Sequence, residues 1–389
     1  MVSLLIHFYK YPQASPKCDN VLRQSKDKNM VLKVLEIGNV GAAGYAGKLF
    51  QRWGADVIRI DLPKEPVPLR TEHVAVDLYL HAGKQRIAIN IETAAGRDLV
   101  RRLAEKVDVL ITDVSPSLLE QLDWENLGSP KLQVRVAITS FGLSGPRKNW
   151  HASNNVLLAM GGQTFLMGDP GRAPLTMPGR YLLYQSGQYA YTAILATLLG
   201  QTEATRQIDV SMLEVALSLS QFTTVMWTHG GRIRERHGNN FGSPHPITMY
   251  PCSDGWFAVN VTPDFWPAFV RMLDRPETLT DPRFDTPAKR AENADDLDVI
   301  VRACLGNKSR AEILELGQRI CRVPTGILAS PKELMADTHL NARNFWQTLE
   351  HGGRVLKIPG SSFRYVGETQ PPQPQTTNVV EEACWPRDL

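Results

Sequence analysis

The chain has 389 residues, too many for one ordinary hydrophobic core, so its length predicts two domains. Hydrophobic residues make up 43% of it and charged residues 21%, which is typical of a globular soluble protein. The formal net charge of +3 is too small to favour nucleic acid or an anionic membrane as a partner, and no apolar run approaches the roughly 18–20 residues of a membrane span. The five cysteines are odd in number and form no C-x-x-C pair, so we expect reduced thiols in the cytoplasm and no metal site.

Residues 1–29 precede the first clear strand. They contain Pro12, Pro16 and the polar run Ser25–Asn29, and this composition predicts a disordered, dispensable extension. The first eight residues form an apolar patch, but they lack the basic region and the cleavage site of a secretory signal.

Strands and helices alternate after Met30. A strand at 31–37, a helix at 42–53 and a strand at 55–61 form a βαβ unit. The pattern predicts an α/β fold with a Rossmann-like large domain. Further elements of this domain are expected as a strand at 86–91, a helix at 93–106 and continuous apolar strands at 107–111 and 134–138.

The second half of the chain has a different pattern. Ser211 and Glu214 have the spacing of a capping box, so Glu214 is interpreted as a structural cap and not as a catalytic acid. Residues 231–246, rich in Gly, Arg and Asn, predict a linker into a smaller α+β domain. The expected elements are helices at 154–160, 187–199 and 211–229, a hairpin of strands 247–251 and 256–261, helices at 264–273, 290–305 and 309–320, and a helix starting at the N-cap Ser330.

A glycine-rich turn follows the first strand, with Gly38, Gly41, Gly44 and Gly47, and Asp61 ends the second strand. In Rossmann proteins an acid at this place binds the ribose of a dinucleotide. The glycine spacing, however, is G-x-x-G-x-x-G and not G-x-G-x-x-G. Close packing of a helix on a strand needs small residues equally well, so an NAD site is kept as an alternative.

Four segments carry a resemblance to a known family: residues 31–61, Ser140–Pro146, 174–200 and Tyr250–Gly255. They resemble the family III CoA-transferases of the CaiB/BaiF type, the formyl-CoA and carnitine CoA-transferase group. The resemblance implies a large domain built from both chain ends, a small domain between them, and two subunits threaded through each other as an interlocked dimer. The boundaries expected on this basis are an extension at 1–29, a large domain of 30–230 and 335–370, a linker at 231–246, a small domain at 247–334 and a tail at 371–389.

In this family the reacting group is an aspartate four residues before a helix-starting glycine, in a pattern like G-x-x-x-D-x-x-x-G-x-x-A. The matching stretch runs from Gly179 to Ala190, and Leu183 stands at the position of the aspartate. The resemblance implies that a carboxylate there attacks the acyl-CoA thioester, forms a mixed anhydride and becomes an enzyme-bound CoA thioester. Leucine cannot do this chemistry, so we expect no catalytic residue in this chain.

The positions that the resemblance assigns to CoA binding are altered as well. Asp113 replaces the family's asparagine, and Ser115 and Gln121 replace two arginines. Gly41 stands where the family has a glutamine near the first turn. Arginine binds phosphate through a planar, permanently charged fork, which neither serine nor glutamine replaces. These four positions are therefore expected to form a degenerate CoA site.

One other acid is a candidate for the nucleophile, and a second has a structural interpretation. Asp169, in Gly168-Asp169-Pro170-Gly171, is the fallback candidate for a displaced nucleophile, although Asp before Pro with Gly after is ordinary turn chemistry. Asp209 matches a family position that is structural.

The leading hypothesis is a non-catalytic subunit of a heteromeric CoA-transferase, resembling the degenerate subunit of the benzylsuccinate-type enzymes of aromatic acid degradation. A catalytically complete homologue is the expected partner, with an acyl-CoA and a carboxylic acid as substrates, CoA as co-substrate and no tightly bound cofactor. The alternatives are an active homodimer with a displaced nucleophile and a non-enzymatic or NAD-binding protein.

Overall fold

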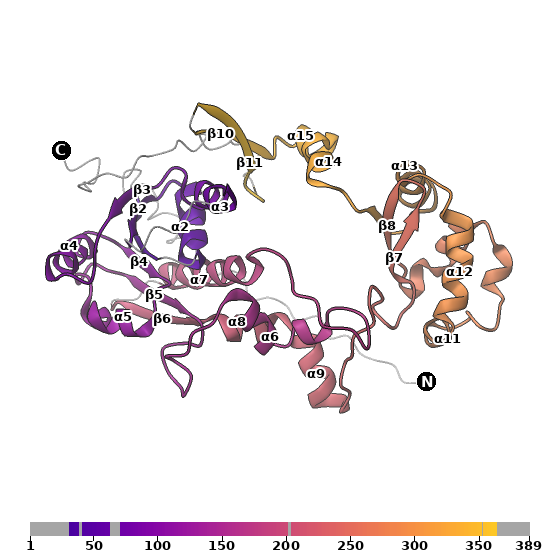
Figure 1. Ribbon diagram of the computed structural model, residues 1–389, viewed down its shortest axis with the longest axis horizontal. Coiled ribbons are helices and arrows are strands. Elements are labelled where there is room, and N and C mark those ends of the chain that lie inside the picture. The colour runs from indigo at the N-terminus through magenta and orange to yellow at the C-terminus, as the bar shows by residue number, and fades with distance from the viewer. Residues whose placement is uncertain (1–30, 39–40, 63–70, 201–203, 352, 364–389) are drawn as a thin grey trace, which may run out of the picture. The chain divides into compact units, whose positions relative to one another are not determined.

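A computed structural model describes residues 31–38, 41–62, 71–200, 204–351 and 353–363 (Figure 1). The chain divides into two compact units: a large unit within residues 1–152, 180–215 and 348–389, and a small unit of residues 153–179 and 216–347. The sequence analysis instead placed 153–179, 216–230 and 335–347 in the large domain, and that division stays a prediction. The predicted extension at 1–29 and the predicted tail at 371–389 lie outside the described residues.

The large unit is built on a parallel sheet of six strands in the order β3-β2-β1-β4-β5-β6. This order confirms the predicted α/β fold with a Rossmann-like sheet. Leu35 of β1 pairs with Ile58 of β2 on one side and with Leu110 of β4 on the other. The strands are β1 Lys33–Ile37, β2 Asp56–Asp61, β3 Gln85–Ala88, β4 Val109–Thr112, β5 Val134–Thr139 and β6 Arg206–Ser211.

The apolar runs of the central strands form the core of the large unit. Helix α4, Ala94–Ala104, begins where the Thr93 side chain accepts a hydrogen bond from the Gly96 N–H (3.0 Å), and it buries Val100 and Leu103. One buried cluster joins this helix to the strands, because continuous apolar strands are covered on both faces. It includes Leu35, Ile37, Ile58, Ile60, Ile87, Val100, Leu103, Leu110, Leu119 and Trp124.

Helix α2, Ala42–Arg52, packs closely against helix α7, Tyr181–Leu199 (Figure 1). A Cβ atom on Gly187 would lie 2.4 Å from the Ala42 carbonyl oxygen, so a glycine is needed where the two helices meet. The sequence analysis started this helix at Gly187, which was wrong: the helix begins six residues earlier, and Gly187 marks a packing contact. Helix α3, Thr71–His81, was not predicted.

Replacing Gly187 by alanine should lower the free energy of unfolding by about 1–3 kcal/mol, because a backbone carbonyl cannot move away as a flexible side chain can. This loss exceeds the gain in helix propensity from alanine. Urea denaturation measures it. Gly326 of β9 is the matched control, because a Cβ atom there meets nothing within 4 Å and Gly326→Ala should be nearly neutral. Equal effects at both glycines would contradict the packing argument.

The segment after β5 also differs from its prediction. A single helix was expected at 211–229, but the chain first completes β6, up to Ser211. It then forms α8, Met212–Leu219, and α9, Gln221–Gly230, with a break at Ser220. Ser211 still acts as a cap, since its hydroxyl accepts a hydrogen bond from the Glu214 N–H (3.4 Å). The predicted helix at 154–160 is confirmed as α6, Asn154–Met160.

The small unit contains a three-stranded antiparallel sheet in the order β7-β8-β9. The predicted hairpin is confirmed as β7, Ile247–Cys252, and β8, Gly255–Asn260, while β9, Thr325–Ile327, was not predicted. The helix expected at 309–320 is α13, Arg310–Leu314, continued by a π-helix at Glu315–Cys321. The Ser330 cap is confirmed as a full capping box with Glu333.

The other elements complete the described chain. Among the described residues, no helix has both the length and the apolar character to cross a membrane. The remaining elements are α5 Pro116–Gln121, the 3-10 helices Trp124–Asn126 (η1), Thr164–Leu166, Pro263–Phe265 and Pro276–Leu279, the helices α10 Trp266–Leu273, α11 Pro287–Glu292, α12 Ala294–Leu305, α14 Pro331–Ala336 and α15 Thr338–Ala342, and the two-stranded sheet of β10 Trp346–His351 and β11 Arg354–Pro359.

Candidate functional site

The candidate site lies at the carboxyl ends of β1 and β4, where α2 begins; we call it the strand-end site. Asp113 follows β4 directly, and its buried carboxylate accepts hydrogen bonds from the N–H groups of Gly41 (2.9 Å) and Ala43 (3.0 Å). Gly41 has φ +112°, and a Cβ atom on Gly38 would lie 2.2 Å from Asp113 Oδ1, so both positions favour glycine. A helix N-terminus attracts anions. Here the chain's own carboxylate binds there.

Leu183 lies in the first turn of α7 and is only 5% exposed. It is four residues before Gly187, which contacts the first residue of α2, and residues four apart share one face of a helix. Leu183 is therefore on the face of α7 that packs toward the start of α2. Its alkyl side chain offers neither a nucleophile nor a proton.

Ser115 and Gln121, the two residues expected at arginine positions of the family, lie at the two ends of α5. Ser115 stands at its N-cap and makes no capping hydrogen bond; its Oγ lies 3.0 Å from Ser117 Oγ. Gln121 is the last residue of the helix, and both side chains are exposed. Ser115 therefore shares the strand end with Asp113, and Gln121 lies one helix length away. Neither residue adds a positive charge.

Asp169, the fallback candidate for the nucleophile, lies in the small unit. Asp169 is exposed in a turn closed by the Arg172 N–H and the Asp169 carbonyl (3.3 Å), and its carboxylate pairs with the Arg172 guanidinium (3.4 Å). Asp209 of β6 accepts a hydrogen bond from the Leu143 N–H (2.8 Å), which holds the loop after β5. Both acids have structural contacts of the kind that the sequence suggested.

A cluster of buried charges lies behind the strand-end site, and the sequence analysis missed it; we call it the buried charge cluster. Glu36 of β1, fully buried, pairs with Lys84 (2.6 Å) and with Arg59 of β2. Lys84 also donates to the Gly44 carbonyl (2.8 Å), and Arg59 donates to the Gly38 carbonyl (2.8 Å). The cluster thus ties the glycine-rich turn and the start of α2 to β1, β2 and the residue before β3.

The pKa values in this cluster reflect both burial and pairing. Burial alone would raise the pKa of Glu36, but the charges of Lys84 and Arg59 lower it below its ordinary value. Burial lowers the pKa of Lys84 to about 8, against the opposing pull of Glu36. His81 stays neutral at physiological pH, because burial and the nearby Lys84 charge lower its pKa well below the ordinary range. No sequence signal distinguishes Glu36 from a solvent-facing acid in a strand.

The surroundings of Asp61 do not support the alternative of an NAD site, for which Asp61 would bind the ribose. Asp61 accepts hydrogen bonds from the Nε atoms of Arg59 (2.6 Å) and Arg86 (2.7 Å). A carboxylate bound by two guanidinium groups is not poised for a ribose hydroxyl.

Lys48 of α2 is a second unexpected buried titratable group. Its Nζ lies 3.6 Å from the centre of the Tyr79 ring and donates a hydrogen bond to the Tyr79 carbonyl. Tyr45 and Tyr184 stack beside it with ring centres 4.9 Å apart. Burial lowers the pKa of Lys48 to about 6, and the charges of Arg52 and Lys84 add to this effect.

Neither metal ligands nor paired thiols enter this geometry. In the described part of the chain, no three His, Cys, Asp or Glu side chains are grouped so as to hold a metal ion. Cys252, Cys304 and Cys321 are free thiols.

Comparisons with known proteins agree with the fold. The family model for CoA-transferase family III matches residues 31–377. The chain is 29% identical to the succinyl-CoA–D-citramalate CoA-transferase of Chloroflexus aurantiacus, over 80% of this chain and 81% of the relative. It is 28% identical to the BbsE subunit of the succinyl-CoA:(R)-benzylsuccinate CoA-transferase of Thauera aromatica, over 84% and 85%.

The fold has a solved counterpart as well. A CaiB/BaiF family protein from Brucella suis superposes with a TM-score of 0.76 at 24% identity and covers 90% of this chain and 96% of its own. A family model that spans nearly the whole described chain, together with relatives matched over four fifths of their length, shows the family. The chain therefore belongs to CoA-transferase family III.

Proposed function

We propose that this chain is the non-catalytic subunit of a heteromeric CoA-transferase that moves CoA between an acyl-CoA and a carboxylic acid. The carrying observation is the pair of residues at the strand-end site: Leu183 at the nucleophile position and Asp113 bound to the start of α2. A catalytically complete homologue supplies the reacting carboxylate and the CoA contacts. The cytoplasm is the proposed location.

Asp113 gives the loss of CoA binding a physical reason. A carboxylate held by two backbone N–H groups already satisfies the positive end of α2, where an anionic ligand would otherwise gain most. A phosphate approaching this turn meets the negative charge of Asp113. Ser115 and Gln121 add no cation, and the positive charge beside Gly41 is that of Arg180, whose Nη1 lies 3.7 Å from the place of a Cβ atom on Gly41. The degenerate positions Gly41, Asp113, Ser115 and Gln121 thus act together against CoA.

Exposed apolar side chains favour a subunit role. Phe222, Val225 and Trp227 on α9 are each more than half exposed, and large apolar residues gathered on one helix are typical of a surface that another chain covers. A relative at 28% identity is itself described as a subunit. We infer an interlocked assembly, in which each chain would bury far more surface than in a standard contact.

Mass spectrometry tests the missing chemistry. The purified chain, incubated with succinyl-CoA, should stay at its unmodified mass, because no carboxylate can form the covalent CoA thioester. Leu183→Asp should restore little activity by itself, since correct positioning of the thioester contributes several kcal/mol that a lone carboxylate lacks. Leu183→Asn is the matched control. A stoichiometric, hydroxylamine-sensitive adduct on the unaltered chain would refute the proposal and direct attention to Asp169 and an active homodimer.

Co-expression tests the assembly. With a complete homologue, the chain should co-purify at equal stoichiometry with one active site per pair, because obligate interfaces are inseparable from folding. Alone it should aggregate or form an inactive dimer. Full activity of the homologue without this chain, on the same substrates, would count against a subunit role and favour a non-enzymatic binding protein.

A further inference from the structure

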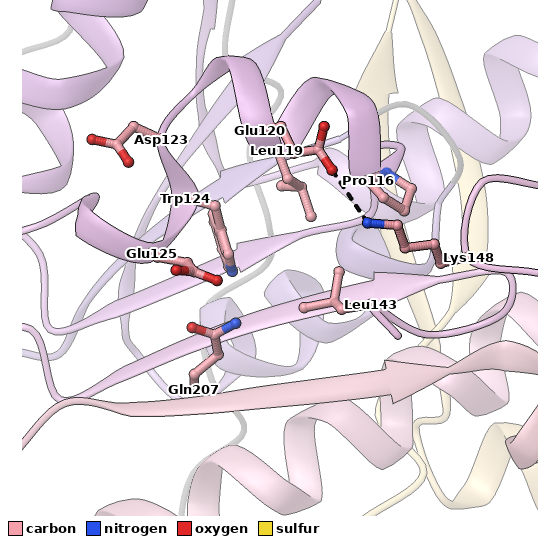
Figure 2. A pocket seen from close by; sticks show the side chains of 9 residues that line it. All are labelled: Pro116, Leu119, Glu120, Asp123, Trp124, Glu125, Leu143, Lys148 and Gln207. Atoms are coloured by element: carbon pink, nitrogen blue, oxygen red, sulfur yellow. Dashed lines mark hydrogen bonds and ion pairs between the residues drawn. The ribbon is translucent and has the colours of Figure 1, made fainter. Parts of the chain in front are cut away.

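A pocket of about 310 Å³ lies in the large unit beside α5; we call it the side pocket (Figure 2). One end holds the exposed ion pair of Glu120 and Lys148 (3.5 Å). Leu119 and Leu143 form apolar walls between this end and the other. The full lining is Pro116, Leu119, Glu120, Asp123, Trp124, Glu125, Leu143, Lys148 and Gln207.

The other end gathers three polar side chains, of which the buried Trp124 indole nitrogen has no hydrogen-bond partner within the described residues. The Trp124 indole nitrogen, the Glu125 carboxylate and the Gln207 amide are directed toward the same part of the pocket (Figure 2). Trp124 is 4% exposed, and its Nε1 finds no hydrogen-bond acceptor anywhere in the described structure. A buried indole N–H normally has an acceptor, and losing one costs free energy. This donor therefore points to a ligand that carries an acceptor.

The segment that carries these groups is held in place. The Arg135 guanidinium of β5 donates hydrogen bonds to the carbonyls of Trp124 (2.6 Å) and Glu125. Asn126 Nδ2 donates to Asp123 Oδ1 (2.9 Å) across the start of η1. The polar end is thus preorganised, which reduces the entropy that a ligand would lose on binding.

The charges around the pocket determine whether a cationic or an anionic ligand is favoured. Three carboxylates, of Glu120, Asp123 and Glu125, stand against two cations: the Lys148 ammonium, which Glu120 pairs, and the Arg135 guanidinium, whose charge interacts with Glu125 and Asp123. The balance near the pocket is thus one negative charge. Phosphates are repelled by such a lining, so the side pocket is unsuited to CoA. A cation is favoured near Glu125, because Glu120 is paired with Lys148 and Asp123 Oδ1 already accepts a hydrogen bond from Asn126 Nδ2.

We infer that the side pocket binds a small aliphatic amine that carries an uncharged oxygen acceptor a few bonds from its ammonium group, as in an amino amide or an amino alcohol. The oxygen accepts the Trp124 N–H, the ammonium donates to Glu125, and the aliphatic part packs on Leu119 and Leu143. Gln207 can donate to the oxygen or accept from the amine. The volume is at the small end for ligand sites, in keeping with a molecule of this size.

Calorimetry with L-leucinamide on the full chain tests this inference, independently of the proposed transferase role. L-leucinamide should bind at least about tenfold more tightly than 3-methylbutylamine, which lacks the acceptor, and than 4-methylpentanamide, which lacks the amine. Glu125→Gln should weaken leucinamide binding about tenfold through loss of a charge-assisted hydrogen bond. Trp124→Phe should weaken leucinamide binding severalfold, so that the affinity for leucinamide approaches the affinity for 3-methylbutylamine.

Matched controls separate binding from folding. Glu125 is exposed, so Glu125→Gln should melt at the temperature of the unaltered chain, and Glu105→Gln, at the exposed end of α4, should leave leucinamide binding unchanged. Saturable binding lost in Glu125→Gln and kept in Glu105→Gln supports the site. Absence of saturable binding by all three probes, or equal binding by both variants, overturns it.

Discussion

Replacing Glu36 by glutamine should lower the free energy of unfolding by about 3–5 kcal/mol, a large part of the roughly 5–15 kcal/mol that typically stabilises a native protein. Glu36 is fully buried between Lys84 (2.6 Å) and Arg59, and Lys84 has no exposure to water. Without the carboxylate, an ammonium is left buried next to an amide. Urea denaturation at pH 7 measures the loss.

Two comparisons identify the cause of that loss. Asp285→Asn, which breaks the exposed ion pair with Lys289 (2.9 Å), should cost less than about 1 kcal/mol. The double variant Glu36→Gln/Lys84→Met should lose clearly less than the sum of its single variants, because it removes both charges together. Additive losses would show that packing around Glu36, and not its charge, stabilises the fold.

Replacing Lys48 by methionine should raise the free energy of unfolding by about 2–4 kcal/mol at pH 7. Burial lowers the pKa of Lys48 to about 6 from an ordinary 10.5, so at pH 7 the chain must release this proton when it folds. Methionine has a similar length and no proton to release. Its loss of the hydrogen bond to the Tyr79 carbonyl offsets part of the gain.

The pH dependence gives this prediction its sign. The pKa of Lys48 is lower in the folded chain than in the unfolded chain, so between pH 6 and 10.5 the unfolded chain binds more protons. Stability from this group therefore rises with pH across that window. Lys84, whose folded pKa is about 8, adds a rise only above pH 8. The gain in unfolding free energy from Lys48→Met should thus shrink between pH 6.5 and 8. The exposed control Lys106→Met should show no such trend. A gain that stays constant over this range would contradict the lowered pKa of Lys48.

The fold was largely readable from periodicity, and the exceptions have physical reasons. Helix α6 and the hairpin of β7 and β8 were predicted because their apolar spacing and turn residues agree. Strand β6 was missed because it is an edge strand whose Arg206, Gln207 and Asp209 are exposed, so it lacks the apolar run of a covered strand. The start of α7 was misplaced because Gly187 was taken for a helix start when it serves close packing.

The sequence was enough to select the residues of the candidate site, but it did not predict which groups they contact. Leu183 and Asp113 were recognised as departures from the family pattern, yet nothing local shows that Asp113 binds the start of α2, because its partners lie about 70 residues earlier. Glu36 and Lys84 are 48 residues apart and meet only when three strands assemble. Charges that pair over such separations leave no periodic signal in a single sequence.

The strand order has a consequence for synthesis. Strand β5 ends at Thr139 and its neighbour β6 begins at Arg206, so residues 140–205 must be made before the sheet can close. Until then the nascent chain presents β5, a Val-Arg-Val-Ala-Ile-Thr run, with one row of N–H and C=O groups unpaired. Such an apolar edge is a template for pairing with other nascent chains. A shortened chain that stops before Arg206 would keep this edge permanently open, whereas the polar β6 closes it.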